Sequence, residues 1–231
     1  MKPTLLFDLD GTLVDTLPDL TATLNRTLGA AGLQPFATAE VATMIGDGVT
    51  VLLTRALARR NRPFDAALLT RFHADYSAAL SVASRPYPGT VETLTALANS
   101  GWLLAVATNK PEAPARKLLQ ALDLAKFFAA IGGGDSFPVR KPDPGHLLLT
   151  LAAAGGDRRR AAMLGDHAND VKAARAAGLT PVFALWGYGS ETMADGAQTA
   201  SKITDLPPLL ERLIEPRAQA PSASPATSGC Q

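Results

Sequence analysis

Five short apolar runs recur along the chain, and each is followed by glycine or by polar residues that favour a turn. Runs of this kind are typical of strands that are buried on both faces of a parallel sheet. We therefore predict strands at Thr4–Phe7, Trp102–Ala107, Phe127–Ile131, Ala161–Leu164 and Pro181–Leu185, with the weakest pattern at Phe127–Ile131.

Segments with helical spacing of their apolar residues lie between these runs. They are Thr90–Ser100, Pro114–Leu122, His146–Ala154 and Asn169–Ala177, and glycines follow three of them. Glycine is a common stop signal because it adopts the left-handed conformation that ends many helices. Strands that alternate with helices predict an α/β fold, in which a Rossmann-like parallel sheet is covered on both faces.

The segment from Leu17 to Pro86 breaks this alternation. It contains no convincing strand, and its apolar residues recur at helical spacing in Leu20–Leu28, Val49–Ala58 and Ala66–Leu80. We predict an all-helical domain inserted after the first strand, with Pro86–Gly89 as the return linker, because proline disfavours helix at its own and the preceding position.

The chain thus divides into three parts. The predicted parts are an α/β core of residues 1–14 and 88–215, a helical domain of residues 15–87, and a disordered tail of residues 216–231 that is rich in Pro, Ala, Ser and Gln.

Composition excludes several classes of protein. A net charge of +1 argues against a broad surface for polyanions, and Arg158–Arg160 has no interleaved aromatic residues, so we expect no nucleic-acid partner. The single cysteine, Cys230, allows no disulfide within the chain, and with only three histidines we expect no zinc centre. We expect His73 and His146 to lie on helix surfaces without a role.

No apolar run approaches the ~20 residues of a membrane span. The N-terminus also lacks the pattern of a signal peptide, since Asp8 follows shortly after Leu5 and Leu6. We expect a cytoplasmic protein with no membrane partner. Whether it is a monomer or a homodimer stays open.

The chemically informative residues follow the predicted strands. Asp8 and Asp10 follow the first strand, Thr108 and Asn109 the second, and Asp166 and Asp170 the fourth, while Lys141 lies in a loop before a helix. Ligands of doubly wound sheets bind beyond the carboxyl ends of the strands, so these side chains should meet at one edge. Carboxylates held this close repel one another unless a cation offsets them, and oxygen ligands favour Mg²⁺. The site suggests Mg²⁺-assisted phosphoryl transfer to an aspartate.

Four motifs, in order, resemble those of the haloacid dehalogenase superfamily. Further details, among them Gly46-Asp47-Gly48 and Gly187-Tyr188-Gly189, resemble its phosphoglycolate phosphatase branch. The four motifs are Asp8–Thr16, Thr108-Asn109-Lys110, Lys141-Pro142-Asp143-Pro144 and Gly165–Asp170.

The resemblance implies a role for each matching residue. Asp8 would be the nucleophile, and Asp10 would protonate the leaving group and then activate water. Lys141 would neutralise charge on Asp8 and the phosphoryl group, whose oxygens Thr108 and Asn109 would hold. Mg²⁺ would be bound by Asp8, the Asp10 carbonyl and Asp166, with Asp170 completing or orienting the set.

The inserted domain would then be a cap that closes over the site. Gly46 and Arg55 are its candidates for substrate binding, because Arg55 could pair with a substrate carboxylate, although a solvent-exposed Arg55 is an equal alternative. One departure is His167, where the branch usually has Ser, and this places the hydrogen bonding around Asp166 in doubt.

The implied function is hydrolysis of a small phosphomonoester, with 2-phosphoglycolate as first choice. Asp10 argues against a dehalogenase or a phosphonate hydrolase, which would lack this second acid. A phosphatase for amino-sugar phosphates, nucleotides or pyrophosphate stays open, as does a phosphomutase of the beta-phosphoglucomutase type. The alternative from another class is a non-catalytic binding or regulatory protein.

Overall fold

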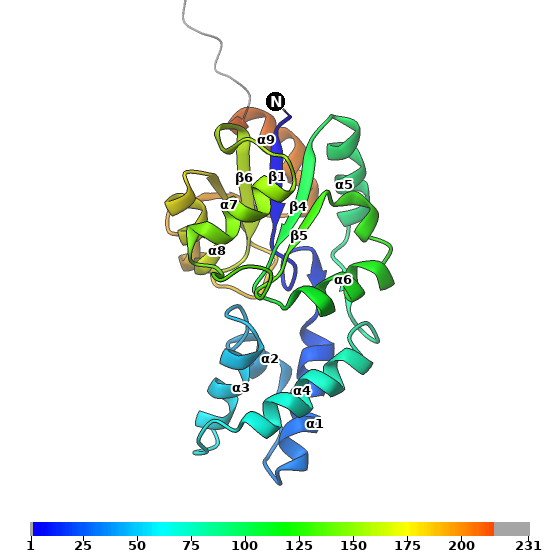
Figure 1. The fold of residues 1–231 in the computed structure, drawn as a ribbon, viewed down its shortest axis with the longest axis vertical. Helices are drawn as coiled ribbons and strands as arrows, with labels where there is room; N and C mark the ends of the chain where they lie inside the picture. Colours follow the sequence, from blue (N-terminus) through cyan, green and yellow to red (C-terminus); the bar gives the residue numbers. More distant parts are fainter. Residues whose placement is uncertain (1, 215–231) are drawn as a thin grey trace, which may run out of the picture.

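A six-stranded parallel sheet forms the centre of the computed structural model, which describes residues 2–214 (Figure 1). Its strand order is β5-β4-β1-β6-β7-β8. These strands are β1 (Thr4–Phe7), β4 (Leu103–Ala107), β5 (Ala130–Gly132), β6 (Ala161–Gly165), β7 (Thr180–Ala184) and β8 (Gln198–Ala200). Four of the five predicted strands are present to within one residue at each end, and the fifth, predicted at Phe127–Ile131, begins only at Ala130 because Phe127 ends a short 3₁₀ turn. The parallel sheet confirms the α/β class.

The central strand β1 shows why the apolar runs form buried strands. All four of its residues are buried, and alternate side chains point to opposite faces. Leu5 and Phe7 join the apolar cluster on one face, whereas Leu6 joins the cluster on the other. A continuous apolar run is therefore needed here, because both faces of the sheet are covered by helices.

The covering helices divide between the two faces. Their apolar residues belong to one cluster for α5, α6 and α9 and to the other for α7 and α8. These helices are α5 (Thr90–Asn99), α6 (Glu112–Ala121), α7 (Pro144–Ala153), α8 (Ala168–Ala177) and α9 (Leu206–Ile214).

Four further helices lie beyond one end of the sheet, in the lower part of Figure 1. We call them the helical unit: α1 (Leu17–Ala30), α2 (Thr38–Ala42), α3 (Val49–Ala58) and α4 (Ala66–Ala78). Helix α1 buries Leu20, Leu24 and Leu28 on one stripe, which packs against α4 and α2.

The two chain segments that join the helical unit to the sheet pair with each other. Strands β2 (Val14–Asp15) and β3 (Arg85–Pro86) form an antiparallel two-stranded ladder, which we call the hinge ladder. The expectation of no strand between Leu17 and Pro86 is thus wrong at Arg85. The sequence gives no sign of this strand because its partner lies about 70 residues away.

The hinge ladder is anchored by a buried carboxylate. Asp19, in the first turn of α1, accepts hydrogen bonds from the backbone amides of Ala83 and Ser84 and from the Ser84 hydroxyl at 2.7–3.0 Å. The start of the first helix is thereby tied to the segment that returns to the sheet.

Strand β8 and helix α9 were not predicted from the sequence. Gln198 and Thr199 are exposed on the edge strand β8, so it lacks an apolar run. Pro207 and Pro208 resemble helix breakers, but they lie in the first turn of α9, where the helix requires no amide hydrogen bonds.

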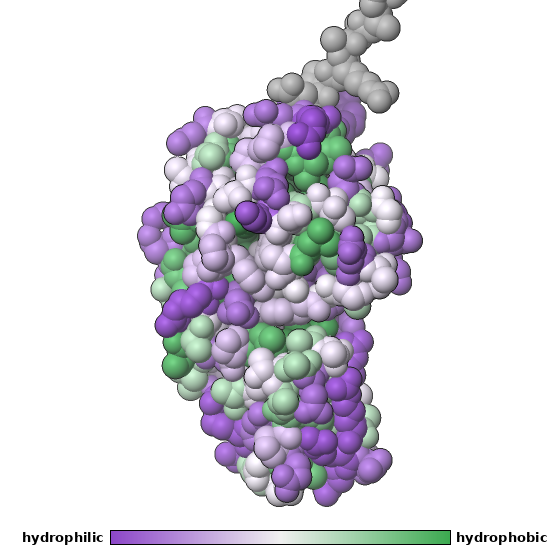
Figure 2. Space-filling view, turned by 180° about the vertical axis from the view of Figure 1, so that it is seen from behind, coloured by the Kyte–Doolittle hydropathy of each residue, from purple (hydrophilic) through white to green (hydrophobic). Residues whose placement is uncertain are grey.

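Polar residues cover much of the face in Figure 2, with smaller apolar areas between them on both the sheet part and the helical unit. Within residues 2–214, no helix combines the length and the apolar character that a membrane span requires. The predicted tail, residues 216–231, lies outside the described residues.

Candidate functional site

The predicted site residues gather at the carboxyl edge of the sheet. Asp8 follows β1, Thr108 follows β4 and Asp166 follows β6. Because β1 pairs with β4 on one side and with β6 on the other, all in parallel, these three strand ends are neighbours. The direction of winding reverses between β1 and β6, and ligands of such sheets bind at that point.

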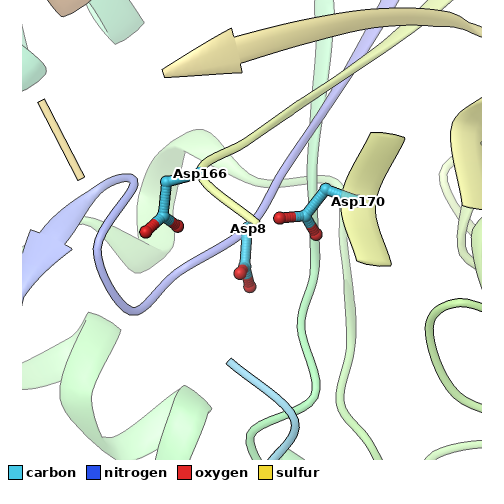
Figure 3. A group of neighbouring side chains, drawn as sticks. All are labelled: Asp8, Asp166 and Asp170. Carbon is cyan, nitrogen blue, oxygen red and sulfur yellow. The ribbon is translucent and has the colours of Figure 1, made fainter. Parts of the chain in front are cut away.

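Three carboxylates converge there. One oxygen from each of Asp8, Asp166 and Asp170 lies within 4.8 Å of the others, and all three residues are buried. Figure 3 shows Asp8 between the other two side chains. Asp170 reaches the group because it is the third residue of α8, one turn after Asp166.

The Lys141 ammonium pairs with two of these carboxylates. Its Nζ lies 3.0 Å from Asp8 Oδ1 and 2.6 Å from Asp170 Oδ1, and its side chain has no exposed surface. Burial raises the pKa of Asp170 to about 7 and also raises the pKa of Asp8, while Lys141 acts in the opposite direction. The single buried ammonium of Lys141 therefore does not fully offset the negative charge of the three carboxylates.

Asp166 is fixed by hydrogen bonds from two loops. The Thr12 hydroxyl donates to Oδ1 at 2.9 Å, and the Tyr188 amide donates to Oδ2 at 2.8 Å. A Cβ at Gly187 would lie 2.2 Å from Asp166 Cβ, so only glycine allows this loop to approach. The glycine at position 187 of the Gly187-Tyr188-Gly189 motif is therefore required for the Tyr188 amide to reach Asp166.

Asp10 has a cation of its own. Lys110 Nζ lies 3.0 and 3.2 Å from the two Asp10 carboxylate oxygens and donates to the Tyr76 hydroxyl at 2.7 Å. Burial lowers the pKa of Lys110, but Asp10 and Tyr76 outweigh it and raise this pKa above its ordinary value. Tyr76 comes from α4, so this contact joins the helical unit to the sheet.

Thr108 and Asn109 are buried beside Asp8. Thr108 Oγ1 accepts a hydrogen bond from the Lys110 amide at 3.2 Å. Asn109 Nδ2 donates to the carbonyls of Gly46 at 3.3 Å and Lys141 at 3.1 Å. Asn109 therefore also connects the helical unit with the core.

Gly46 sits in a narrow gap over His167. Its φ is +118°, and a Cβ there would lie 2.4 Å from His167 Cδ2. Its carbonyl also accepts a hydrogen bond from Asn169 at 2.8 Å. His167 Nδ1 lies 3.1 Å from Asp166 Oδ2. Burial lowers the His167 pKa, but this contact and the charges of Asp166, Asp170 and Asp8 together outweigh it and raise the pKa to about 9.

Arg55 lies apart from the carboxylates. Its guanidinium pairs with Asp47 at 2.5 Å and donates to the Met44 carbonyl at 3.0 Å, and its side chain is 41% exposed. It lines an open groove that also contains Asp47, His167 and Tyr188.

A small cavity lies between the helical unit and the carboxylates. Its volume of about 30 Å³ holds no more than a few water molecules. The sheet side contributes polar residues and the helical unit contributes mainly apolar ones. They are Asp8, Asp10, Thr108, Asn109 and Lys110 on the sheet side, and Leu20, Ile45, Gly46, Gly48, Val49 and Leu52 on the other.

His146 is buried, so the expectation that it lies on the surface is wrong. It belongs to the face of α7 that packs on the sheet, and its Nε2 lies 3.0 Å from the Gly133 carbonyl. Burial lowers its pKa to about 4, which keeps the imidazole neutral. His73 is half-buried on α4.

Sequence reasoning missed the contacts of Lys110 and Tyr76. Lys110 stands directly after Thr108 and Asn109, so its position in the motif could have shown that it faces the site. No local signal distinguishes Tyr76 from other apolar residues of α4.

Comparison with known proteins gives consistent matches. The family model of the haloacid dehalogenase-like hydrolases matches residues 2–178. The phosphoglycolate phosphatase of Agrobacterium fabrum is 42% identical over 228 residues, which cover 95% of this chain and 97% of the relative. That of Mesorhizobium japonicum is 44% identical over 191 residues, covering 81% and 84%. The crystal structure of a predicted phosphoglycolate phosphatase from Haemophilus somnus superposes with a TM-score of 0.83 at 31% identity, covering 90% of this chain and 97% of that one.

Proposed function

The chain belongs to the haloacid dehalogenase-like hydrolases and is a phosphatase, and on this premise we propose that it hydrolyses 2-phosphoglycolate to glycolate and phosphate. The observation that carries the proposal is the buried group of Asp8, Asp166 and Asp170, of which Asp8 also lines a small cavity. The names of the relatives support the choice of substrate.

The charges at the site fit a divalent cation. Four carboxylates, those of Asp8, Asp10, Asp166 and Asp170, lie near two buried ammonium groups and the His167 imidazole, whose raised pKa favours its charged form; this leaves an excess of one negative charge. The donors are all oxygen atoms, which Mg²⁺ prefers. We propose that Asp8, Asp166 and the Asp10 carbonyl hold the ion and that Asp170 orients the set. Bound there, the ion would neutralise charge on the phosphoryl group.

Asp8 acts as the nucleophile in the proposed reaction. Its carboxylate attacks phosphorus, forming an aspartyl-phosphate as the bond to the ester oxygen breaks. The Leu9 amide, which donates to Asp8 Oδ1 at 2.7 Å, and Lys141 orient the carboxylate. Burial raises the pKa of Asp8, and the charge of Lys141 acts in the opposite direction and favours the carboxylate form.

Asp10 moves the proton in both halves of the reaction. It donates a proton to the leaving ester oxygen, then accepts one from the water that attacks the aspartyl-phosphate. That second step releases phosphate and regenerates the Asp8 carboxylate. Thr108 and the Asn109 amide bind the phosphoryl oxygens beside it.

The helical unit acts as a cap in this proposal, with the cap assigned to residues 15–87 and the core to residues 1–14 and 88–215. Its residues Ile45, Val49 and Leu52 form the apolar wall of the cavity and would exclude bulk water while the aspartyl-phosphate exists. A cavity this small favours a leaving group of a few atoms over a sugar or a nucleoside.

A cytoplasmic location and a monomer or homodimer complete the proposal. A single cysteine, which allows no disulfide within the chain, is compatible with a reducing compartment.

The test is a panel of phosphate esters assayed with Mg²⁺. It contains 2-phosphoglycolate, glucose phosphates, pyrophosphate, nucleoside monophosphates and amino-sugar phosphates. We expect 2-phosphoglycolate to have the highest kcat/KM, and Asp8→Asn to lower turnover about a thousandfold or more. Asp123→Asn, on an exposed loop, is the matched control and should leave turnover unchanged.

Two outcomes would contradict the proposal. A preference of less than about tenfold for 2-phosphoglycolate over the rest of the panel would exclude the narrow substrate and leave the phosphatase class. Indifference of all turnover to Asp8→Asn would exclude Asp8 as nucleophile and favour a binding protein.

A further inference from the structure

We propose that Lys110 recognises the leaving group by pairing its ammonium with a carboxylate two bonds from the ester oxygen, so that the site selects phosphate esters of 2-hydroxy acids. The inference rests on the proposed phosphatase function and deepens it, because it assigns the substrate's second anionic group to one residue.

Lys110 lies where a leaving group would bind. It lines the cavity together with Asp8 and Asp10, and among the described residues of this lining it alone carries a positive charge. Its side chain is only 1% exposed, so an ion pair formed here is shielded from water. Lys141 does not line this cavity, and its ammonium pairs with Asp8 and Asp170.

The proposed reaction places the substrate carboxylate within reach of Lys110. Asp10 must touch the ester oxygen to protonate it, and Lys110 Nζ is 3.0 Å from Asp10 Oδ1. In a phosphorylated 2-hydroxy acid, the carboxylate carbon is two bonds from that same oxygen. A substrate placed for proton transfer from Asp10 therefore brings its carboxylate to Lys110.

Lys110 can also exchange one of its hydrogen bonds for a contact with the substrate. An ammonium has three N–H groups, and Nζ has three acceptor atoms, the two Asp10 carboxylate oxygens at 3.0 and 3.2 Å and the Tyr76 hydroxyl at 2.7 Å. Because two of these acceptors belong to one carboxylate, a single N–H can retain the pairing with Asp10 while another turns to a bound carboxylate. Tyr76 holds the ammonium from the cap side, so recognition depends on the closed cap.

Arg55, the candidate suggested by the sequence, is less suited. Asp47 already pairs with its guanidinium, which lines the open groove and not the cavity. The helical unit lines the same cavity with the apolar residues Leu20, Ile45, Val49 and Leu52. A leaving group rich in hydroxyls would lose hydrogen bonds to water against this wall, which disfavours sugar phosphates.

The test compares 2-phosphoglycolate with 2-hydroxyethyl phosphate, which has the same chain length and no carboxylate, and with phosphoethanolamine, which carries a cation. The readout is the ratio of kcat/KM for 2-phosphoglycolate to kcat/KM for 2-hydroxyethyl phosphate. Loss of catalysis through Asp10 affects both substrates equally and cancels in this ratio. We expect the wild-type protein to turn over phosphoethanolamine least.

Lys110→Met should lower the ratio about tenfold to a hundredfold, the usual effect of losing a charged hydrogen bond. Lys110→Arg should retain part of the preference. Lys172→Met, at an exposed site on α8, and Arg55→Met should leave the ratio at its wild-type value.

An unchanged ratio in Lys110→Met, or its collapse in Arg55→Met, overturns the inference while the phosphatase assignment stands. A wild-type protein without any preference for 2-phosphoglycolate overturns the proposed substrate and this inference together. If Lys110→Met fails to fold, the role of Lys110 is tested on the wild-type protein by comparing two isomeric phosphate esters. The 2-phosphate of lactate should exceed the 3-phosphate of 3-hydroxypropionate in kcat/KM, and the reverse order refutes the role of Lys110.

Discussion

Two lysines are buried at the carboxyl edge of the sheet, and each lies against a different carboxylate of the first motif. Lys141 contacts Asp8 and Lys110 contacts Asp10. In the proposed mechanism, the nucleophile and the acid–base residue therefore have separate counter-charges. Removing Lys141 would leave the buried carboxylates of Asp8 and Asp170 without their ammonium, which costs about 3–5 kcal/mol in proteins, whereas Asp10 is partly exposed and should lose less when Lys110 is removed.

Gly46 offers a test at the residue scale. We expect Gly46→Ala to lower kcat/KM about tenfold or more, because its Cβ would meet the His167 ring at 2.4 Å and displace the loop that closes the cavity. Steady-state kinetics with 2-phosphoglycolate measure the effect, and circular dichroism checks that the fold is retained.

Gly32 is the matched control for this substitution. It also lies in the helical unit and has a positive φ of +68°, but a Cβ there would meet no atom within 4 Å. Gly32→Ala should thus carry the milder strain of the left-handed region, without a clash, and keep full activity. Equal losses in both variants would show that strain, and not the contact with His167, is responsible.

At the scale of elements, the local sequence pattern predicted those strands whose residues are all buried. Strands such as Ala161–Gly165 are apolar throughout and follow clear helical segments, so their positions could be predicted within one or two residues. β8 could not, because it is an edge strand with polar residues. β3 could not, because it exists only through pairing with Val14–Asp15.

In the candidate site, too, some residues could be placed from the local sequence pattern, whereas others depend on contacts between distant elements. Asp8, Thr108 and Asp166 were placed together because each directly follows a strand of one parallel sheet. The contact between Lys110 and Tyr76 joins two elements that are 34 residues apart in sequence. It depends on how the helical unit packs on the core, which local spacing does not encode.

Asp19 gives a prediction for the hinge ladder. Asp19→Ala should lower the free energy of unfolding by about 3 kcal/mol, because the buried amide and hydroxyl of Ser84 and the part-buried amide of Ala83 lose their acceptor. Urea unfolding followed by circular dichroism measures this. The control is Asp75→Ala on α4, whose 3.5 Å pair with Arg71 is more exposed and should contribute less than about 0.5 kcal/mol. Similar losses for both variants would argue against an anchoring role of Asp19.

For the whole molecule, a net charge of +1 conceals the excess of negative charge at the site. Mg²⁺ binding to the folded state should therefore stabilise the protein, by about 2.7 kcal/mol at a concentration a hundred times Kd. We expect the melting temperature to rise by about 5 °C or more.

Differential scanning calorimetry with and without Mg²⁺ checks this expectation. Asp166→Asn should remove most of the rise, whereas Asp123→Asn should retain it. A wild-type protein whose melting temperature ignores Mg²⁺ at millimolar concentrations would contradict the proposed metal site.

The hinge ladder affects how the inserted helical segment can change during evolution. Because Val14–Asp15 and Arg85–Pro86 lie side by side, the interruption of the α/β core begins and ends at the same point in space. Loop-closure entropy changes only slowly with the number of residues between two paired ends. A gene could therefore lengthen, shorten or exchange everything between these strands with little effect on core topology. Substrate choice, which Tyr76 and the apolar wall would serve in the proposed function, could diverge by recombination while Asp8 and its partners stayed in place.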